Sequence, residues 1–177
     1  AFDSCSTGRL KVVSPEAARN TLADLGESGL VTKILSHINA AKISGIGVEV
    51  PAGDDAAVIG AEGSSLVLSV DMYAEGKHFR TDWSTGIEIG RRCAAASMAD
   101  VCAMGAKPAG VLLAIGLPGS TTTHWAGEFL AGFMEETDGA GAVVLGGDVS
   151  DCENIVISVT AIGHVAVGAA LTRSGAS

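Results

Sequence analysis

Two hydrophobic periodicities alternate along the chain and predict a mixture of helices and strands. Apolar residues three or four positions apart indicate amphipathic helices, whereas short aliphatic runs between glycines indicate buried strands. Helices are expected from Ser14 to Gly26, from about Ser28 through Ile38, over 86–105 and over 123–137, and strands over 56–59, 66–70, 110–116, 142–145 and 155–167. With no repeat or linker, we predict an N-terminal extension with a first helix (residues 1–24) and one α/β (α+β) domain (residues 25–177).

The expected helices have capping residues and apolar faces. Ser14-Pro15-Glu16 supplies an N-cap, a proline at the first helical position and an acid in the first turn. The residues expected to face the core are Leu30, Ile34, Leu35 and Ile38 in the second helix and Trp125, Phe129, Phe133 and Met134 in the last one.

The composition indicates a globular, acidic protein. Nearly half of the 177 residues are apolar (47%), and only 18% are charged, which excludes a disordered chain. The net charge of −9 predicts no binding to nucleic acid or anionic membranes. The uncharged stretch 155–172 is rich in Val, Ile and Thr, and we interpret it as a buried strand rather than a membrane span. No signal peptide is visible, and the four cysteines lack a C-x-x-C spacing, so we expect reduced thiols in a cytoplasmic protein.

Several aspartates lie at or just beyond expected buried elements. Asp54 and Asp55 precede the strand 56–59, Asp71 follows the strand 66–70, and Asp148 follows 142–145 after two glycines. A strand end beside glycine is a place where a ligand can approach the backbone. These carboxylates are therefore candidates for one common site.

Asp100 lies on the expected apolar face of a helix. A buried carboxylate needs a partner, and Arg91, Arg92 or a backbone N–H would each provide an ordinary one. The residues that share this face are Ile89, Cys93, Ala96, Asp100 and Met104.

Converging carboxylates would need a cation, and hard oxygen ligands favour Mg²⁺ over zinc. The sequence has no G-x-x-x-x-G-K-[ST] loop, so polyphosphate would have to be held through metal ions and glycine N–H groups such as those of Gly146-Gly147. The residues alone predict a metal-dependent, phosphate-handling enzyme.

An ordered set of short motifs spans residues 25–177. The motifs are Leu25-Gly26-Glu27, Gly53-Asp54-Asp55-Ala56-Ala57, Ser69-Val70-Asp71-Met72, Glu75-Gly76-Lys77-His78-Phe79, Ala99-Asp100-Val101-Cys102-Ala103-Met104-Gly105-Ala106, Gly146-Gly147-Asp148, Ser158-Val159-Thr160-Ala161-Ile162-Gly163 and Leu171-Thr172-Arg173-Ser174-Gly175-Ala176. In this order the set resembles thiamine-monophosphate kinases, within the aminoimidazole ribonucleotide synthetase superfamily, and the run from Ser69 to Phe79 distinguishes this family from its relatives.

The resemblance implies a mixed sheet with helices on one face, which dimerises into a shared β-barrel, and it implies roles for particular residues. His78 corresponds to a contact with thiamine monophosphate, and Asp54 is expected to order its loop. The implied Mg²⁺ ligands are Asp55, Ser69, Val70 (through its carbonyl), Asp71, Asp100 and Asp148, and the implied ATP contacts are Gly147, Asp148 and Arg173. Taken singly, His78, Asp148 and Arg173 also fit ordinary surface or turn roles.

The chain departs from the family pattern in sequence and in length. Val70 stands where the family usually has Thr, and Met98-Ala99-Asp100 replaces Leu-Ser-Asp. The family's chains continue for about as long again, with a further metal motif and part of the thiamine pocket, so we expect this chain to correspond to their N-terminal half.

The implied reaction is in-line transfer of the γ-phosphoryl group of ATP to thiamine monophosphate. The acceptor phosphate is ionised near neutral pH, its second pKa being about 6, so no general base is required. The alternatives are another ATP-using synthetase of the superfamily and a dimeric nucleotide-binding module without turnover. Cys5 lacks the lysine and glycine-rich loop that a selenophosphate synthetase would need.

Overall fold

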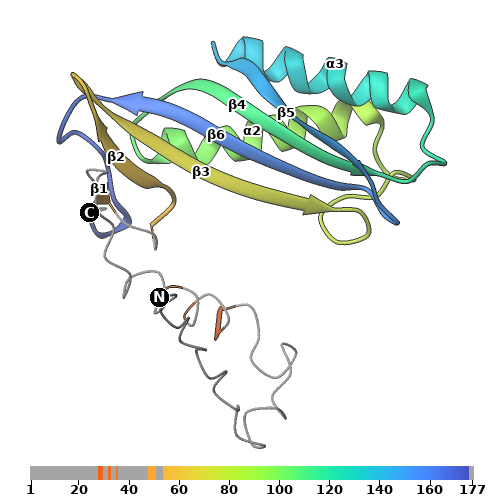
Figure 1. The fold of residues 1–177 in the computed structure, drawn as a ribbon, viewed down its shortest axis with the longest axis horizontal. Coiled ribbons are helices and arrows are strands. Elements are labelled where there is room, and N and C mark those ends of the chain that lie inside the picture. Colours follow the sequence, from red (N-terminus) through yellow and green to blue (C-terminus); the bar gives the residue numbers. More distant parts are fainter. Residues whose placement is uncertain (1–27, 30–31, 33–34, 36–47, 51–53, 176–177) are drawn as a thin grey trace, which may run out of the picture. The chain divides into compact units, whose positions relative to one another are not determined.

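A computed structural model describes residues 28–29, 32, 35, 48–50 and 54–175 of the chain (Figure 1). Ser28, Gly29, Thr32 and Leu35 are helical, as predicted, and the Thr32 hydroxyl donates to the Ser28 carbonyl at 2.9 Å. The helix expected over 14–26, and the inward positions Leu30, Ile34 and Ile38, lie outside the described residues.

One mixed sheet forms the centre of the domain, and its strand order is β1-β2-β3-β6-β4-β5. The final strand along the chain, β6, lies between β3 and β4 and is antiparallel to both, while β4 and β5 are parallel. The strands are β1 (Val48–Val50), β2 (Ala57–Ala61), β3 (Ser64–Ala74), β4 (Lys107–Leu117), β5 (Val143–Asp151) and β6 (Val156–Val165).

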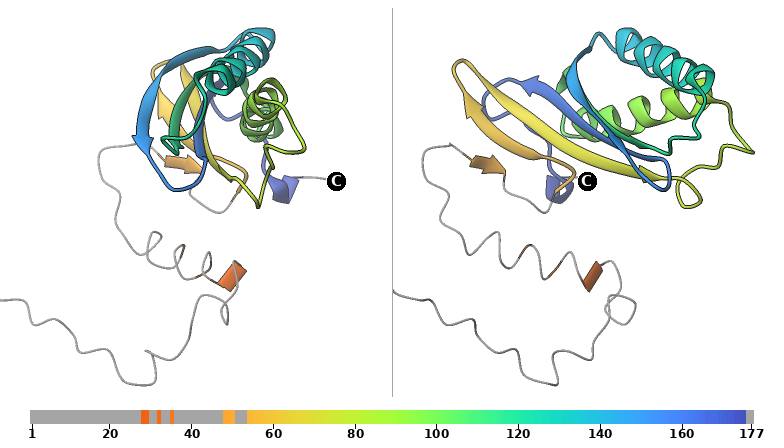
Figure 2. Two further views of the ribbon diagram at one scale, coloured as in Figure 1. Left: turned by 90° about the vertical axis from the view of Figure 1, so that its right-hand side faces the viewer. Right: turned by 45° about the vertical axis from the view of Figure 1, so that its right-hand side comes forward.

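Two long helices, α2 (Gly86–Ala103) and α3 (Thr123–Gly139), cover one face of this sheet (Figures 1 and 2). α2 begins with a capping box, in which the Thr85 N–H donates to the Glu88 carboxylate at 2.8 Å and the Glu88 N–H donates to the Thr85 hydroxyl at 3.3 Å. The expected α/β fold, with a mixed sheet and its helices on one face, is confirmed. None of the described helices is both long and apolar enough to cross a membrane.

The core lies between the helices and the facing side of the sheet. Phe129 and Phe133 of α3 are fully buried, whereas Met134 is 51% exposed, so the prediction that Met134 faces the core was wrong. The helix α2 buries Ile89, Cys93 and Met98, but Ala96 is exposed. The largest fully buried side chains of the sheet are Ile157, Val58, Val67, Val111 and Val159.

Glycines let α2 and α3 approach each other at backbone distance. A Cβ atom on Gly90 would lie 2.1 Å from the Phe129 carbonyl oxygen, and one on Gly132 would lie 2.1 Å from that of Ile87. No side chain fits at either position without separating the helices. This contact fixes α2, and with it Asp100, relative to the rest of the core.

Two strands are longer than predicted, which changes the setting of two aspartates. Asp71 does not follow its strand but lies inside β3, because the pairing with β6 continues to Ala74. Asp148 likewise lies inside β5, because the parallel pairing with β4 continues from Gly110–Val143 to Leu117–Asp151. Both carboxylates therefore project from a sheet face rather than from a loop.

Candidate metal and phosphate site

Asp55 and Arg173 join two segments that are 118 residues apart in the sequence. Asp55 lies just before β2, and Arg173 begins the short 3₁₀ helix η1 (Arg173–Gly175). The Arg173 Nε donates to Asp55 Oδ1 at 2.8 Å, and its terminal nitrogen contacts the same oxygen. The backbone N–H of Arg173 donates to the Asp54 carboxylate at 3.2 Å, and Asp54 Oδ1 also accepts from the Asp55 N–H at 2.8 Å. Asp54 thus orders both segments, in agreement with its expected loop role.

Ser69 connects Asp55 with Asp100. Its hydroxyl lies 3.1 Å from Asp100 Oδ2 and 3.4 Å from the Asp55 carbonyl oxygen. Ser69 supplies the partner that a half-buried Asp100 requires. The expected partners were wrong, since Arg91 pairs with Glu135 at 2.7 Å and Asp100 receives no hydrogen bond from Arg92 or a backbone N–H among the described residues.

Asp71 belongs to a second hydrogen-bond network beside this one. Tyr73, two residues later on the same face of β3, donates to Asp71 Oδ2 at 2.9 Å, and its hydroxyl lies 2.8 Å from the Ser97 hydroxyl of α2. Burial raises the pKa of Tyr73 first of all, and the neighbouring Asp71 raises it further. Tyr73 therefore remains a neutral donor that holds the Asp71 carboxylate toward α2.

The carboxylates of Asp55 and Asp71 both lie close enough to Asp100 to repel its negative charge. Burial is the main cause that raises the pKa of Asp100, the Ser69 hydrogen bond lowers it, and the charges of Asp71 and Asp55 raise it. Within the described part of the chain, however, no three His, Cys, Asp or Glu side chains are grouped closely enough to hold a metal ion. In this arrangement the cation beside Asp55 is the Arg173 guanidinium.

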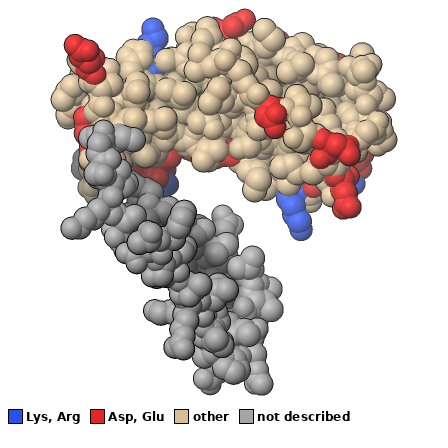
Figure 3. Space-filling view, in the orientation of Figure 1, with Lys and Arg blue, Asp and Glu red and all other residues tan. Residues whose placement is uncertain are grey.

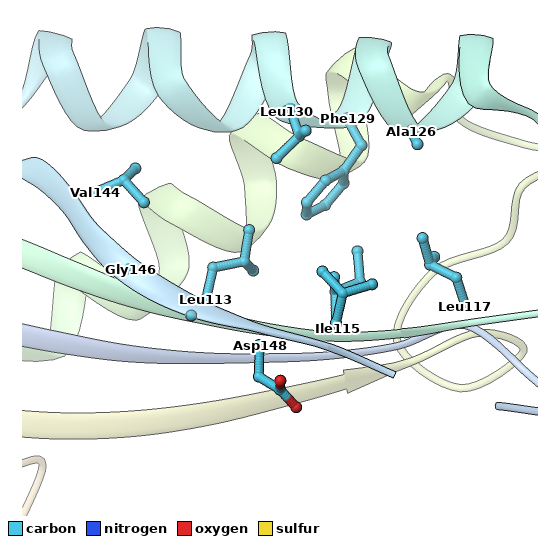
Figure 4. A pocket seen from close by; sticks show the side chains of 11 residues that line it. Leu113, Ile115, Leu117, Ala126, Phe129, Leu130, Val144, Gly146 and Asp148 are labelled. Carbon is cyan, nitrogen blue, oxygen red and sulfur yellow. The ribbon is translucent and has the colours of Figure 1, made fainter. Parts of the chain in front are cut away.

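The other residues of the expected metal set lie elsewhere. Val70 pairs with Thr160 of β6, and its side chain, 65% exposed, projects from the sheet face opposite the helices. Asp148 also projects away from the helices (Figure 4), and its carboxylate accepts a hydrogen bond from the Ser150 hydroxyl at 3.2 Å. β5 lies three strands from β3, or about 14 Å at 4.8 Å per strand. The structure therefore brings together Asp55, Ser69, Asp71, Asp100 and Arg173, but not Asp148.

Gly147 and Asp148 border an apolar cavity of about 510 Å³ between α3 and the β4–β5 edge (Figure 4). Its walls are mostly aliphatic and aromatic and include Leu113, Ile115 and Phe129. A Cβ atom on Gly147 would lie 1.7 Å from the Leu113 carbonyl oxygen, so only glycine permits the approach of β5 to β4 there. The cavity has the size and polarity of a small-molecule site.

His78 lies in the turn after β3. Its side chain is exposed, and its Nδ1 accepts a hydrogen bond from the Ala74 N–H at 2.9 Å. The imidazole contacts the Tyr73 ring edge-on, with 6.3 Å between the ring centroids. Tyr73 therefore contacts both residues, since its ring packs against His78 and its hydroxyl donates to Asp71.

Tyr73 and Ser97 are members of this site that the sequence analysis missed. Tyr73 is the only tyrosine of the chain, and its spacing of two from Asp71 in a strand was the available signal. Nothing in the sequence indicated Ser97, because a serine within a helix is common and does not by itself predict a functional role.

The fold and the site define a domain in which Asp55 and Asp71 lie near Asp100, in the C-terminal half of α2. Comparison with known proteins gives the family of this domain. Residues 53–165 match the AIR synthase related protein, N-terminal domain, and the chain belongs to this family.

Within it, the chain is similar to thiamine-monophosphate kinases. It is 36% identical to that of Mycobacterium tuberculosis over 88% of this chain and 46% of the relative, and 34% identical to that of Corynebacterium glutamicum over 85% and 44%. A solved structure of AaThiL complexed with AMPPCP and TMP superposes with a TM-score of 0.78 at 27% identity, over 89% of this chain and 47% of that one. The chain spans about half the length of these relatives.

Proposed function

We propose that this chain provides the metal-binding part of an enzyme that transfers the γ-phosphoryl group of ATP to thiamine monophosphate. The observation that carries the proposal is that Asp55 and Asp71 lie near enough to Asp100 to raise the pKa of its carboxyl, with the Ser69 hydroxyl 3.1 Å from the same carboxylate. The similarity to thiamine-monophosphate kinases, one of them complexed with AMPPCP and TMP, supports the choice of substrates.

The donor set fits Mg²⁺ in its chemistry. Carboxylate and hydroxyl oxygens are the ligands that this ion prefers, and it usually binds through one or two carboxylates together with phosphate oxygens. Asp55, Asp71, Asp100 and Ser69 would hold it, with the Val70 carbonyl as a further proposed ligand, whereas Asp148 lies three strands away and is proposed only as an ATP contact. When bound, Mg²⁺ would neutralise negative charge on the phosphates. Arg173 would then be free to leave Asp55 and contact ATP.

Gly147 and Asp148 are proposed ATP contacts because they border the apolar cavity beside α3. Its aliphatic and aromatic walls suit the planar base of a nucleotide, whereas the carboxylates suit the charged end. His78 is the proposed contact to thiamine monophosphate.

We further propose a homodimer through the open face of the sheet. This face carries large apolar side chains that are exposed in the single chain, namely Val70 (65%), Met72 (64%) and Leu112 (41%). The surface seen in Figure 3 also carries few Lys or Arg side chains. Contiguous exposed apolar residues of this kind are typical of protein–protein interfaces. A strictly monomeric species in light scattering would contradict the dimer.

Calorimetric titration with AMPPCP, with and without Mg²⁺, tests the site. We expect Mg²⁺-dependent binding that Asp71→Asn abolishes and that Asp138→Asn, an exposed aspartate near the end of α3, leaves intact. Binding that is unaffected by Asp71→Asn would refute the metal role of this cluster. The alternative is a nucleotide-binding module without turnover, and consumption of ATP that depends on thiamine monophosphate distinguishes the two.

A further inference from the structure

A second cavity, of about 340 Å³, lies where the turn after β3 meets α2, and its lining is cationic. Lys77 and Arg80 come from the turn, Arg92 comes from α2, and Trp83 and His78 complete the wall. Three of the 11 Lys and Arg residues thus border one cavity in a protein with a net charge of −9. Such a local reversal of charge predicts an anionic ligand.

Two of these three cations are available to a ligand. Arg80 is already engaged, since its Nε donates to Asp82 Oδ1 at 2.8 Å and its guanidinium lies 4.3 Å from the centroid of the Trp83 ring. In contrast, neither Lys77 nor Arg92 forms a salt bridge with any carboxylate of residues 54–175. The Glu75 carboxylate near the turn accepts a hydrogen bond from the Thr81 hydroxyl at 2.5 Å.

The cationic cavity and the carboxylate cluster are neighbours along α2. Arg92 and Asp100 are eight residues apart, which places them about 12 Å apart along the helix and about 80° apart around it. Ala96, midway between them, is exposed and small. Tyr73 also links the cavity to the cluster, because its ring contacts His78 of the cavity wall edge-on, with 6.3 Å between the ring centroids, and its hydroxyl donates to Asp71 Oδ2 at 2.9 Å.

We propose that Arg92 and Lys77 bind the phosphate monoester of the phosphoryl acceptor and hold it beside the Asp71 carboxylate. The proposal rests on the function proposed above and adds two binding residues to it. A dianionic phosphate would be repelled by three aspartates unless cations held its other oxygens. Arg92 offers a planar pair of donors for two phosphate oxygens, and Lys77 offers a point charge.

The test measures binding without Mg²⁺ and ATP, so that only the cationic cavity can hold the phosphate. The whole 177-residue chain is titrated calorimetrically in EDTA with thiamine monophosphate, thiamine and inorganic phosphate. The variants are Arg92→Ala, Lys77→Ala and Arg92→Lys, with Arg91→Ala as the matched control on the adjacent position of α2. Circular dichroism establishes that each variant is folded.

We expect Arg92→Ala and Lys77→Ala each to weaken thiamine monophosphate binding about tenfold or more, since each removes a charge-assisted hydrogen bond to the phosphate. Arg92→Lys should retain part of the affinity, Arg91→Ala should retain all of it, and thiamine should bind weakly and equally to all variants. Inorganic phosphate should compete with thiamine monophosphate.

Three results would overturn the proposal, and they separate it from the proposed function. Thiamine monophosphate that binds equally well to wild type and both alanine variants refutes the role of Arg92 and Lys77 but leaves the proposed function intact. Phosphate binding that needs Arg92, without any preference for thiamine monophosphate, rejects both the acceptor assignment and the thiamine substrate. Absence of binding by all three compounds rejects the cavity as an anion site.

Discussion

The close approach of α2 and α3 makes Gly90→Ala a demanding test of the packing. The added Cβ atom would lie 2.1 Å from the Phe129 carbonyl oxygen and 2.8 Å from the Phe133 nitrogen. An ordinary contact begins at 3.4 Å, so the two backbones must separate locally by about 3.4 − 2.1 = 1.3 Å. The obstructing atoms are backbone and cannot rotate away. The separation would loosen Phe129 and Phe133, which are fully buried.

The expected change in the free energy of unfolding for Gly90→Ala is the sum of two opposing effects. Overpacking of this kind costs about 3 kcal/mol, the upper part of the usual range, whereas Ala is favoured over Gly in a helix by about 1 kcal/mol. Gly90→Ala should therefore lower the free energy of unfolding by about 2 kcal/mol and the Tm by about 4–8 °C.

Gly127→Ala provides the matched control, because it is the same substitution inside α3 with no atom within 4 Å of the new Cβ. It should raise the free energy of unfolding by about 1 kcal/mol. Urea unfolding followed by circular dichroism measures both variants, and the slope of the transition should stay unchanged. If Gly90→Ala proved as stable as Gly127→Ala, the backbone contact between the helices would be refuted.

The remaining predictions concern the caps and charges of the site. Thr85→Ala removes the hydroxyl half of the capping box with Glu88 and should cost about 1 kcal/mol in urea unfolding, whereas an unchanged midpoint would contradict the cap. Asp100→Asn should stabilise the metal-free protein at neutral pH. The pKa of Asp100 is raised in the folded state, so its ionised carboxylate destabilises the fold above the unfolded-state pKa of about 3.9. Melting curves should therefore show that the Asn variant is more stable at neutral pH and loses this advantage below about pH 3.9. Arg173→Ala should enlarge the rise in Tm on addition of Mg²⁺, because the guanidinium no longer competes for Asp55; an equal rise in both proteins would show that Arg173 does not compete.

The sequence predicted the elements well where the apolar pattern is long and regular. The helices at 86–103 and 123–139 and the strand at 156–165 were located within a few residues because their apolar spacing lasts for several turns or pairs. The short strand β1 was missed, since three residues carry too little pattern. β3 was predicted too short because an aspartate usually indicates a strand end, whereas Asp71 is tolerated inside the sheet by its hydrogen bond from Tyr73.

It was harder to predict which site residues lie together, because this depends on which face of the sheet each strand residue points to. Successive side chains of a strand point to opposite faces, so a shift of one residue decides whether Gly147 or Asp148 faces the helices. The pairing of Gly147 with Leu113, whose side chain is buried, sends Asp148 to the other face. Similarly, the pairing of Arg173 with Asp55 depends on where the chain returns after β6, which no local pattern encodes.

The central place of β6 has a consequence for how the chain folds during its synthesis. Val165 pairs with Ser65, one hundred residues earlier, and β6 supplies partners to both β3 and β4. At about 5–20 residues per second, the ribosome needs about 5–20 s to add that length. From its own synthesis until that of β6, each of β3 and β4 has an unpaired edge toward the missing strand, which is the kind of edge that pairs with strands of other chains. The two halves of the sheet therefore join only when β6 has been made, and until then the growing chain exposes strand edges that can pair with other chains.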